Sequence, residues 1–270
     1  MFRQMLTWLA AGASAALLLA TVAGLLAPLD PRFEMINHFR PLLTMAAIAL
    51  FVLALLLRRR RLLRATGALS LASAALMLFP LFFAATPANG EKPDLRIVSL
   101  NLWAGNTSLA KSAQFLLATK ADVIVLQEVL CAPTDPLFEK LRAAYPYVHR
   151  LNKRCFGQAI LSKHPILKTG REDYLHRRPI WLWADISLAG RTVRITGVHL
   201  SHPTQPFDQV KNVNALISYV RGVNGPHVIA GDFNLTPIRG CSRNSRDRAG
   251  CGVVAPFRHH GRDTAPFPYF

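Results

Sequence analysis

Hydrophobic residues dominate the first third of the chain, whereas shorter hydrophobic runs alternate with polar segments in the rest. Three apolar stretches lie at about residues 5–29, 41–57 and 65–85, and the second is at the lower limit of length for a membrane span. We therefore predict three transmembrane helices within residues 1–86. A signal peptide is the alternative for the first stretch, but simple secretion does not account for the apolar stretches that follow it directly.

A globular domain is expected at residues 95–237, after a linker at residues 87–94 that is rich in turn-forming and charged residues. Its pattern predicts helices at residues 109–120, 136–144 and 205–220. Strands are expected at residues 96–103, 121–129, 157–162, 180–186 and 192–200, and a last strand ends at Asp232. Because a hairpin signal, Ala189-Gly190-Arg191, interrupts the alternation, the predicted fold class is α/β with mixed sheets.

The composition supports a membrane part joined to a globular part. The chain is 51% hydrophobic with a mean hydropathy of +0.23, which is too apolar for a purely soluble domain. Its net charge of +17 would suit a nucleic acid or an acidic lipid. However, five arginines lie in the run from Arg58 to Arg64 and six more lie between Arg239 and Arg262, so the charge is weak evidence for a polyanionic substrate.

The arginine run between the second and third apolar stretches indicates how the chain is oriented in the membrane. Short arginine-rich loops stay in the cytoplasm, so three spans place the amino terminus inside and everything after Thr86 outside. A nucleic-acid-binding or nuclear-type patch is the alternative. It is disfavoured because apolar stretches flank the run on both sides.

The four cysteines show no pattern typical of a zinc site, because none forms a CxxC pair or a Cys/His cluster at ligand spacing. If the domain lies outside the cytoplasm, Cys131 and Cys155 could form a disulfide. Spacing alone leaves that pairing open.

Isolated polar residues stand at the ends of the predicted strands, namely Asn101, Glu128, His199, Asp232 and Asn234. In an extended backbone Asp232 and Asn234 project to the same face. We expect the whole set to converge at one rim of a sheet, where α/β proteins place their sites. A carboxylate with an amide suits Mg²⁺, and an added imidazole could stabilise a phosphoryl group under attack by water. Taken singly, each residue has a plainer interpretation, such as a turn residue, a surface ion pair or a satisfied core histidine.

Five short motifs occur in a fixed order along residues 95–237. They are Ser99-Leu100-Asn101-Leu102-Trp103, Leu126-Gln127-Glu128, Ile160-Leu161-Ser162, Gly197-Val198-His199-Leu200 and Gly231-Asp232-Phe233-Asn234. In this order the chain resembles the endonuclease/exonuclease/phosphatase (DNase I-like) superfamily, which includes nucleases, sphingomyelinases and inositol polyphosphate phosphatases. The resemblance implies a four-layer α/β sandwich of two mixed sheets with helices outside. It also implies a Mg²⁺-dependent phosphodiester or phosphomonoester hydrolase.

The resemblance also implies roles for the residues at matching positions. Glu128 would bind Mg²⁺, or Mn²⁺ in its place, and Asn101 would support that metal site. His199 would contact the phosphate in the transition state, Asp232 would orient or activate the attacking water, and Asn234 would hold a phosphate oxygen.

The same resemblance bears on substrate and location. The expected substrate is a nucleic acid, a phospholipid head group or a small phosphoester, and no protein partner is inferred. The arrangement with three spans resembles membrane-anchored bacterial members. It implies a multi-pass protein of the inner membrane with its catalytic domain on the periplasmic side.

The sequence departs from the family pattern after Asn234. Members of the family end with an Asp-His element on a last core strand, and nothing in the tail at residues 238–270 matches it. We interpret this tail as truncated or frameshifted, so the sandwich is expected to be incomplete at its carboxyl end. Reading the coding DNA past codon 237 in the other frames tests that interpretation. The alternative function is a catalytically inactive relative that acts at most as a binding module.

Overall fold

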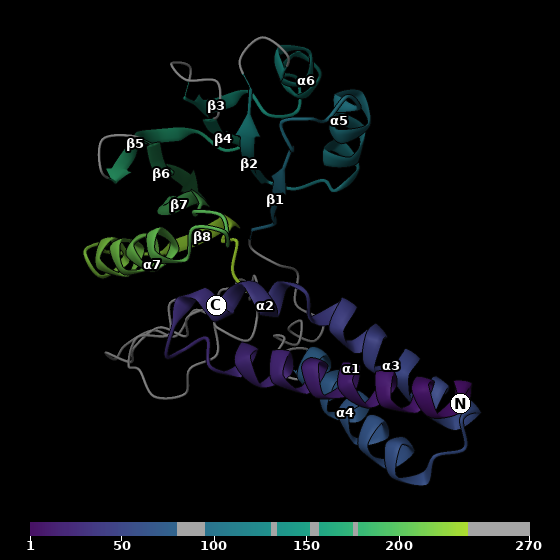
Figure 1. The fold of residues 1–270 in the computed structure, drawn as a ribbon. Helices are drawn as coiled ribbons and strands as arrows, with labels where there is room; N and C mark the ends of the chain where they lie inside the picture. Colours follow the sequence, from purple (N-terminus) through teal and green to yellow (C-terminus); the bar gives the residue numbers. More distant parts are fainter. Residues whose placement is uncertain (80–94, 131–133, 152–156, 175–177, 237–270) are drawn as a thin grey trace. The chain divides into compact units, whose positions relative to one another are not determined.

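The computed structural model describes residues 1–79, 95–130, 134–151, 157–174 and 178–236 (Figure 1). The chain divides into two compact units. One consists mainly of residues 1–85, and the other includes residues 86–202 and 211–234. Four of the sequence predictions lie outside the described residues: the linker at 87–94, the end of the third apolar stretch, the Cys131–Cys155 pairing and the tail at 238–270.

The first unit is entirely helical in its described part. It contains α1 (Phe2–Leu25), the short turn η1 (Pro31–Phe33), α2 (Glu34–His38), α3 (Arg40–Leu56) and α4 (Arg60–Leu78). Small side chains are buried where the long helices meet, among them Ala10, Ala47 and Ala54, and small residues let apolar helices approach closely. The arginine run falls at the turn between α3 and α4 and in the first turn of α4.

The apolar stretches form helices as expected, and their large side chains point outward. Trp8, Leu19 and Leu71 are 70–73% exposed, which suits contact with lipid rather than water. Two helices, α1 and α4, are long and apolar enough to cross a membrane. The number rises to three if the segment Pro31–His38 and α3, which meet at a 60° bend, count as one span.

The second unit contains two four-stranded sheets. The first has the order β1-β2-β4-β3, built from β1 (Ile97–Asn101), β2 (Val123–Val129), β3 (Tyr147–Arg150) and β4 (Gly157–Ser162). The second has the order β5-β6-β7-β8, built from β5 (Ile166–Tyr174), β6 (Arg178–Leu188), β7 (Arg191–His199) and β8 (His227–Asp232). Each sheet has one parallel pair, β1 with β2 and β7 with β8, among antiparallel neighbours. The predicted mixed sheets are therefore confirmed.

Helices cover the outer face of each sheet (Figure 1). The helices α5 (Leu109–Ala118) and α6 (Asp135–Leu141) pack on the first sheet through buried leucines such as Leu116 and Leu137. The inner faces of the two sheets share one apolar core, in which Val125 and Ile160 of the first sheet cluster with Ile195 of the second. The helix α7 (Pro206–Arg221) covers the outer face of the second sheet. The order of layers is thus helix, sheet, sheet, helix.

The hydrophobic pattern missed two strands, β3 and β5. Both lie at the edge of their sheets, where a strand needs no apolar side chains on two faces. Tyr147 and Val148 of β3 are exposed, and β5 is largely polar. The pattern also placed the end of the first strand too late. β1 ends at Asn101, and the chain turns away at Trp103 with a φ of 54°.

Candidate active site

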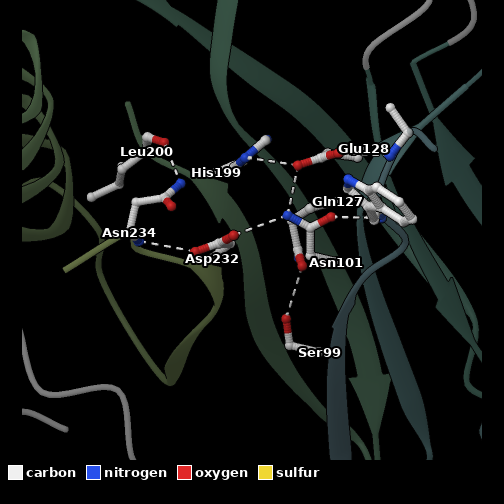
Figure 2. A network of polar contacts seen from close by, with 10 residues as sticks. Ser99, Asn101, Gln127, Glu128, His199, Leu200, Asp232 and Asn234 are labelled. Atoms are coloured by element: carbon white, nitrogen blue, oxygen red, sulfur yellow. Dashed lines mark hydrogen bonds and ion pairs between the residues drawn. The ribbon is translucent and has the colours of Figure 1, made fainter. Parts of the chain in front are cut away.

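Four strands carry the polar side chains of the candidate active site. β1 ends at Asn101, β7 ends at His199 and β8 ends at Asp232, while Glu128 is the last residue but one of β2. Because both pairs of strands are parallel, the carboxyl ends of each pair meet at one edge of its sheet. Figure 2 shows the side chains of the two pairs facing one another in a single polar network.

Asn101 joins the two carboxylates of the network. Its Nδ2 donates to Oε1 of Glu128 at 2.9 Å and to Oδ2 of Asp232 at 2.9 Å, so a residue of the first sheet reaches a carboxylate of the second. Its Oδ1 accepts the backbone N–H of Trp103 at 2.8 Å, and Oε2 of Glu128 accepts the backbone N–H of Ala104 at 2.8 Å. One amide group therefore sets the spacing of both carboxylates, and the loop after β1 holds that amide in place.

His199 lies on the other side of Glu128. Its Nε2 is 3.8 Å from Oε1 of Glu128, which is an ion pair whenever the imidazole is protonated. The two side chains are 30% and 21% exposed, so a ligand from solvent can reach both. In the part of the chain that the structure describes, His199 is the one basic side chain that forms an ion pair with either carboxylate of the network. The described side chains around Asn101 thus comprise two carboxylates and one imidazole.

Asp232 and Asn234 meet through a turn rather than along an extended strand. β8 ends at Asp232, and Asn234 has a φ of 50°, so the expected same-face projection of residues two apart is wrong. The side chain of Asp232 accepts the backbone N–H of Asn234 at 2.9 Å, which is the bond of an Asx-turn. The side chain of Asn234 then donates to the carbonyl oxygen of Leu200 at 3.0 Å. The motif is therefore a turn whose side chains also belong to the polar network.

The backbone around the network adopts unusual conformations. Trp103, Glu128 and Asn234 all have φ between 50° and 54°, a region that residues other than glycine rarely occupy. Gly231 has a φ of 151°, and a Cβ at that position would lie 2.0 Å from the carbonyl oxygen of Val198. Backbone strain of this kind clusters at functional sites, where the surrounding structure holds it in place.

The donor set of the network fits a hard divalent cation. Glu128 and Asp232 present carboxylate oxygens on either side of one amide, and such oxygens are the ligands that Mg²⁺ prefers while it keeps several waters. Among the residues that the structure describes, no group of three or more His, Cys, Asp or Glu side chains forms a metal site. Any cation bound here would therefore rely on few protein ligands.

The structure brings together all five residues that the sequence pattern singled out (Figure 2). It adds three contacts that no side-chain pattern indicated. These are the backbone N–H groups of Trp103 and Ala104, and a polar pair beneath the site in which Ser99 Oγ donates to Oε1 of the buried Gln127 at 3.3 Å. The turn after β1 brings those N–H groups to the site.

Solved structures with a similar fold belong to several proteins. TDP2 from Caenorhabditis elegans aligns with a TM-score of 0.50 at 20% identity, over 68% of this chain and 60% of that one. A β-hairpin deletion mutant of beta toxin from Staphylococcus aureus aligns with a TM-score of 0.44 at 18% identity, over 58% of this chain and 70% of that one. Sphingomyelinase C from Streptomyces griseocarneus aligns with a TM-score of 0.44 at 18% identity, over 53% of this chain and 65% of that one. At such identities the likeness concerns the fold alone.

The chain spans between 60% and 70% of the length of these three structures. No curated protein sequence matches it significantly. The sequence profile of the Endonuclease/Exonuclease/phosphatase family matches residues 98–269, which is more than half of the chain and includes all five site residues. The chain therefore belongs to the Endonuclease/Exonuclease/phosphatase family.

Proposed function

We propose that this chain is a membrane-anchored phosphoesterase that uses Mg²⁺, or Mn²⁺ in its place, to hydrolyse a phosphodiester or a phosphomonoester. The observation that carries the proposal is the convergence of Glu128 and Asp232 on the amide of Asn101 beside His199. It occurs in a chain of a family whose name covers endonucleases, exonucleases and phosphatases.

The charge of the site supports the use of a cation. Two carboxylate oxygens lie within about 5.8 Å of each other, because each is 2.9 Å from the same nitrogen. A phosphoester is itself an anion, so these carboxylates repel it unless a positive charge lies between the carboxylates and the phosphoester. Glu128 would hold the ion and Asn101 would orient Glu128. When bound, the ion would offset negative charge on the phosphate oxygens.

The remaining residues are placed for water attack on phosphorus. Both oxygens of the Asp232 carboxylate accept hydrogen bonds, one from Asn101 and one from the N–H of Asn234, so its orientation is set before a substrate binds. Asp232 would orient the attacking water and accept its proton. His199 would donate a hydrogen bond to a phosphate oxygen as charge develops on it, and the amide of Asn234 would hold another phosphate oxygen.

The apolar helices support a membrane location. Their length and composition are sufficient for two or three spans, and the arginine run between α3 and α4 favours a cytoplasmic position for that turn. The α/β unit would then lie on the periplasmic side of a bacterial-type inner membrane. Added protease tests this topology. It should cleave the α/β unit in intact spheroplasts, and protection there with cleavage in inverted vesicles would reverse the topology.

Two of the solved structures with a similar fold are described by a ligand or by an activity. TDP2 from Danio rerio has been solved in complex with a single-strand DNA product, and another neighbour is a sphingomyelinase C. We propose a phosphoester of nucleic acid, of a phospholipid head group or of a small molecule. A panel of these substrates, assayed with the chain in a lipid bilayer, distinguishes the classes.

The proposed activity is tested with bis-p-nitrophenyl phosphate and the full chain in detergent. Hydrolysis should require Mg²⁺, stop on addition of EDTA and fall by several orders of magnitude in Asp232→Ala. The matched control is Asp122→Ala, because Asp122 lies just before the amino end of β2 and its side chain binds only a backbone N–H in that region. Equal loss of activity in both variants would contradict the assignment of Asp232.

One observation favours a second function, that of an inactive binding module. Residues 235–270 contain no Asp-His pair, although the family profile matches the chain as far as residue 269 and the resemblance to the family implies such a pair at the scissile phosphate. Well-folded wild-type protein that hydrolyses no phosphoester, yet binds one with a Mg²⁺-dependent affinity, would support this function. A chain with the family's carboxyl-terminal element added should then gain activity.

A further inference from the structure

Trp103 stands beside the candidate site with most of its side chain in solvent. It is 69% exposed, although a large aromatic side chain gains much from burial. Its backbone is nevertheless held firmly: the N–H donates to Oδ1 of Asn101 at 2.8 Å, and the carbonyl oxygen accepts the N–H of Asn106 at 2.8 Å. The next N–H, from Ala104, donates to Glu128. The backbone at Trp103 is therefore fixed relative to the residues that would hold the metal ion.

The conformation of Trp103 has an energetic cost. Its φ of 54° is rare for a bulky residue, and strain of this kind persists where the surroundings hold it. The indole also has a supporting surface. A Cβ built on Gly105 would lie 2.9, 3.1 and 3.2 Å from three adjacent ring atoms, and such similar distances mean that Gly105 approaches the face of the ring. One face is thus supported by glycine, and the exposure of the residue leaves the other face to solvent.

We infer that Trp103 is a specificity-determining residue that stacks on a nucleobase of the substrate. This inference rests on the proposed phosphoesterase function and names its substrate class as a single-stranded nucleic acid or a nucleotide ester. A rigid aromatic ring with one open face is the element on which single-stranded nucleic acids stack, and each such contact contributes measurably to binding. The backbone N–H groups of Trp103 and Ala104 bond to Asn101 and Glu128, so a base stacked on the indole would bind beside the site.

The residues next to Trp103 argue against insertion into lipid. A membrane-inserting loop needs several apolar side chains together, whereas residues 104–108 are Ala, Gly, Asn, Thr and Ser. Single aromatic residues on polar loops are suited to contact one flat ligand. The chemistry therefore favours a base over an acyl chain.

The test compares two substrates with the same leaving group, thymidine 5′-(p-nitrophenyl phosphate) and methyl p-nitrophenyl phosphate. The wild-type full chain in detergent should show a lower KM for the nucleoside ester. In Trp103→Ala the KM for the methyl ester divided by the KM for the nucleoside ester should fall by roughly tenfold. Trp103→Phe should retain part of the preference for the nucleoside ester. Phe115→Ala is the control, since Phe115 is also an exposed aromatic residue, 56% exposed on α5, and the ratio should not change.

A purely structural role for Trp103 would affect both substrates equally and leave the ratio of KM values unchanged, which would overturn the inference. A wild-type enzyme without preference for the nucleoside ester would overturn it as well. If Trp103→Ala instead impaired cleavage of a phosphocholine ester in vesicles alone, lipid contact would replace base stacking.

Binding separates failure of this inference from failure of the proposed function. Asp232→Ala should bind a short oligothymidylate, measured by fluorescence anisotropy of a labelled oligonucleotide, and the additional Trp103→Ala substitution should weaken binding roughly tenfold. If wild-type protein hydrolyses neither ester, the proposed function fails while this comparison still decides the role of Trp103. Equal affinity of the two proteins would contradict stacking.

Discussion

Replacing Asn101 with Asp tests the network at its centre. The substitution keeps the size of the side chain but replaces the Nδ2 donor, which lies 2.9 Å from an oxygen of Glu128 and 2.9 Å from an oxygen of Asp232, with an oxygen of a third carboxylate. Two hydrogen bonds to charged acceptors are lost, and each contributes about 1.5 kcal/mol or more. A new repulsion is added between like charges.

The magnitude follows from the geometry. A unit charge about 2.9 Å from another repels it by about 1.4 kcal/mol in water and by several kcal/mol at an effective dielectric constant of about 20. Because Glu128 is 21% exposed, solvent screens much of this repulsion. The two lost hydrogen bonds alone amount to about 3 kcal/mol and the repulsion adds to them, so we expect a loss of at least about 3 kcal/mol, which lowers the melting temperature by at least roughly 6 °C.

The assay is thermal unfolding of the full chain in detergent, with EDTA and with Mg²⁺. Mg²⁺ should restore part of the stability of Asn101→Asp, because a cation offsets the added charge, and should have less effect on Asn101→Ala. Asn106→Asp is the matched control. Asn106 lies in the same loop. Its Oδ1 accepts the N–H of Ser108 at 2.7 Å, which Asp also accepts, and the donation of its Nδ2 to Ser112 Oγ at 3.2 Å, which Asp removes, involves no charged group. A melting temperature of Asn101→Asp equal to that of the control, or an equal Mg²⁺ effect on all variants, would refute the proposed network.

Two further predictions concern the sheet that carries Asp232. Gly231→Ala should prevent correct folding or lower the free energy of unfolding by at least about 3 kcal/mol, because φ is 151° and the new Cβ would clash with the backbone of Val198. Gly222→Ala is the control and should be nearly neutral, because the nearest atom to its new Cβ would be 3.4 Å away. Expression yield and circular dichroism check both variants. Burial, and then the charge of Arg194, lower the pKa of His227 to about 4, while its Nε2 lies 2.8 Å from Thr196 Oγ1. His227 of the unfolded chain therefore becomes protonated below about pH 6.5, whereas His227 of the folded chain stays neutral down to about pH 4. The free energy of unfolding should fall by about 3 kcal/mol as the pH is lowered across that window. Denaturant unfolding at pH 7 and pH 4.5 measures this loss, and an unchanged pH slope in His227→Gln would contradict the assignment to His227.

Much of the α/β unit could be predicted because its central strands are buried on both faces. The continuous apolar run at residues 123–126 occurs where solvent touches neither face, and it marked β2 correctly. Polar residues at the ends of such runs have few structural reasons to be there, which is why the five site residues stood out. The edge strands β3 and β5 give no such signal, since one side of each faces solvent or polar neighbours.

The contacts within the site could not be predicted from local pattern. The bond from Asn101 to Asp232 joins residues 131 positions apart, and it depends on how two sheets pack. The positive φ at Trp103 and at Glu128 likewise could not be predicted from residue type, since neither residue favours it.

The connection between the first two apolar stretches shows the same limit in the helical unit. Residues 30–40 include several charged and polar residues, yet Glu34, Asn37 and Arg40 are buried, and Asn37 Nδ2 donates to both the carbonyl oxygen of Gly24 and Oε2 of Glu34. Composition indicates polarity, whereas burial depends on which partners the fold supplies.

A Mg²⁺ titration of hydrolysis tests the central claim most directly. Bis-p-nitrophenyl phosphate is incubated with the wild-type full chain and with Glu128→Gln, and the rate is followed as Mg²⁺ increases. The wild-type rate should rise to a plateau, and folded Glu128→Gln should need at least about tenfold more Mg²⁺ for half activation, because it lacks the carboxylate that would hold the ion. Hydrolysis that persists in EDTA, or equal half-activating Mg²⁺ concentrations for the two proteins, would contradict the proposed Mg²⁺-dependent phosphoesterase site.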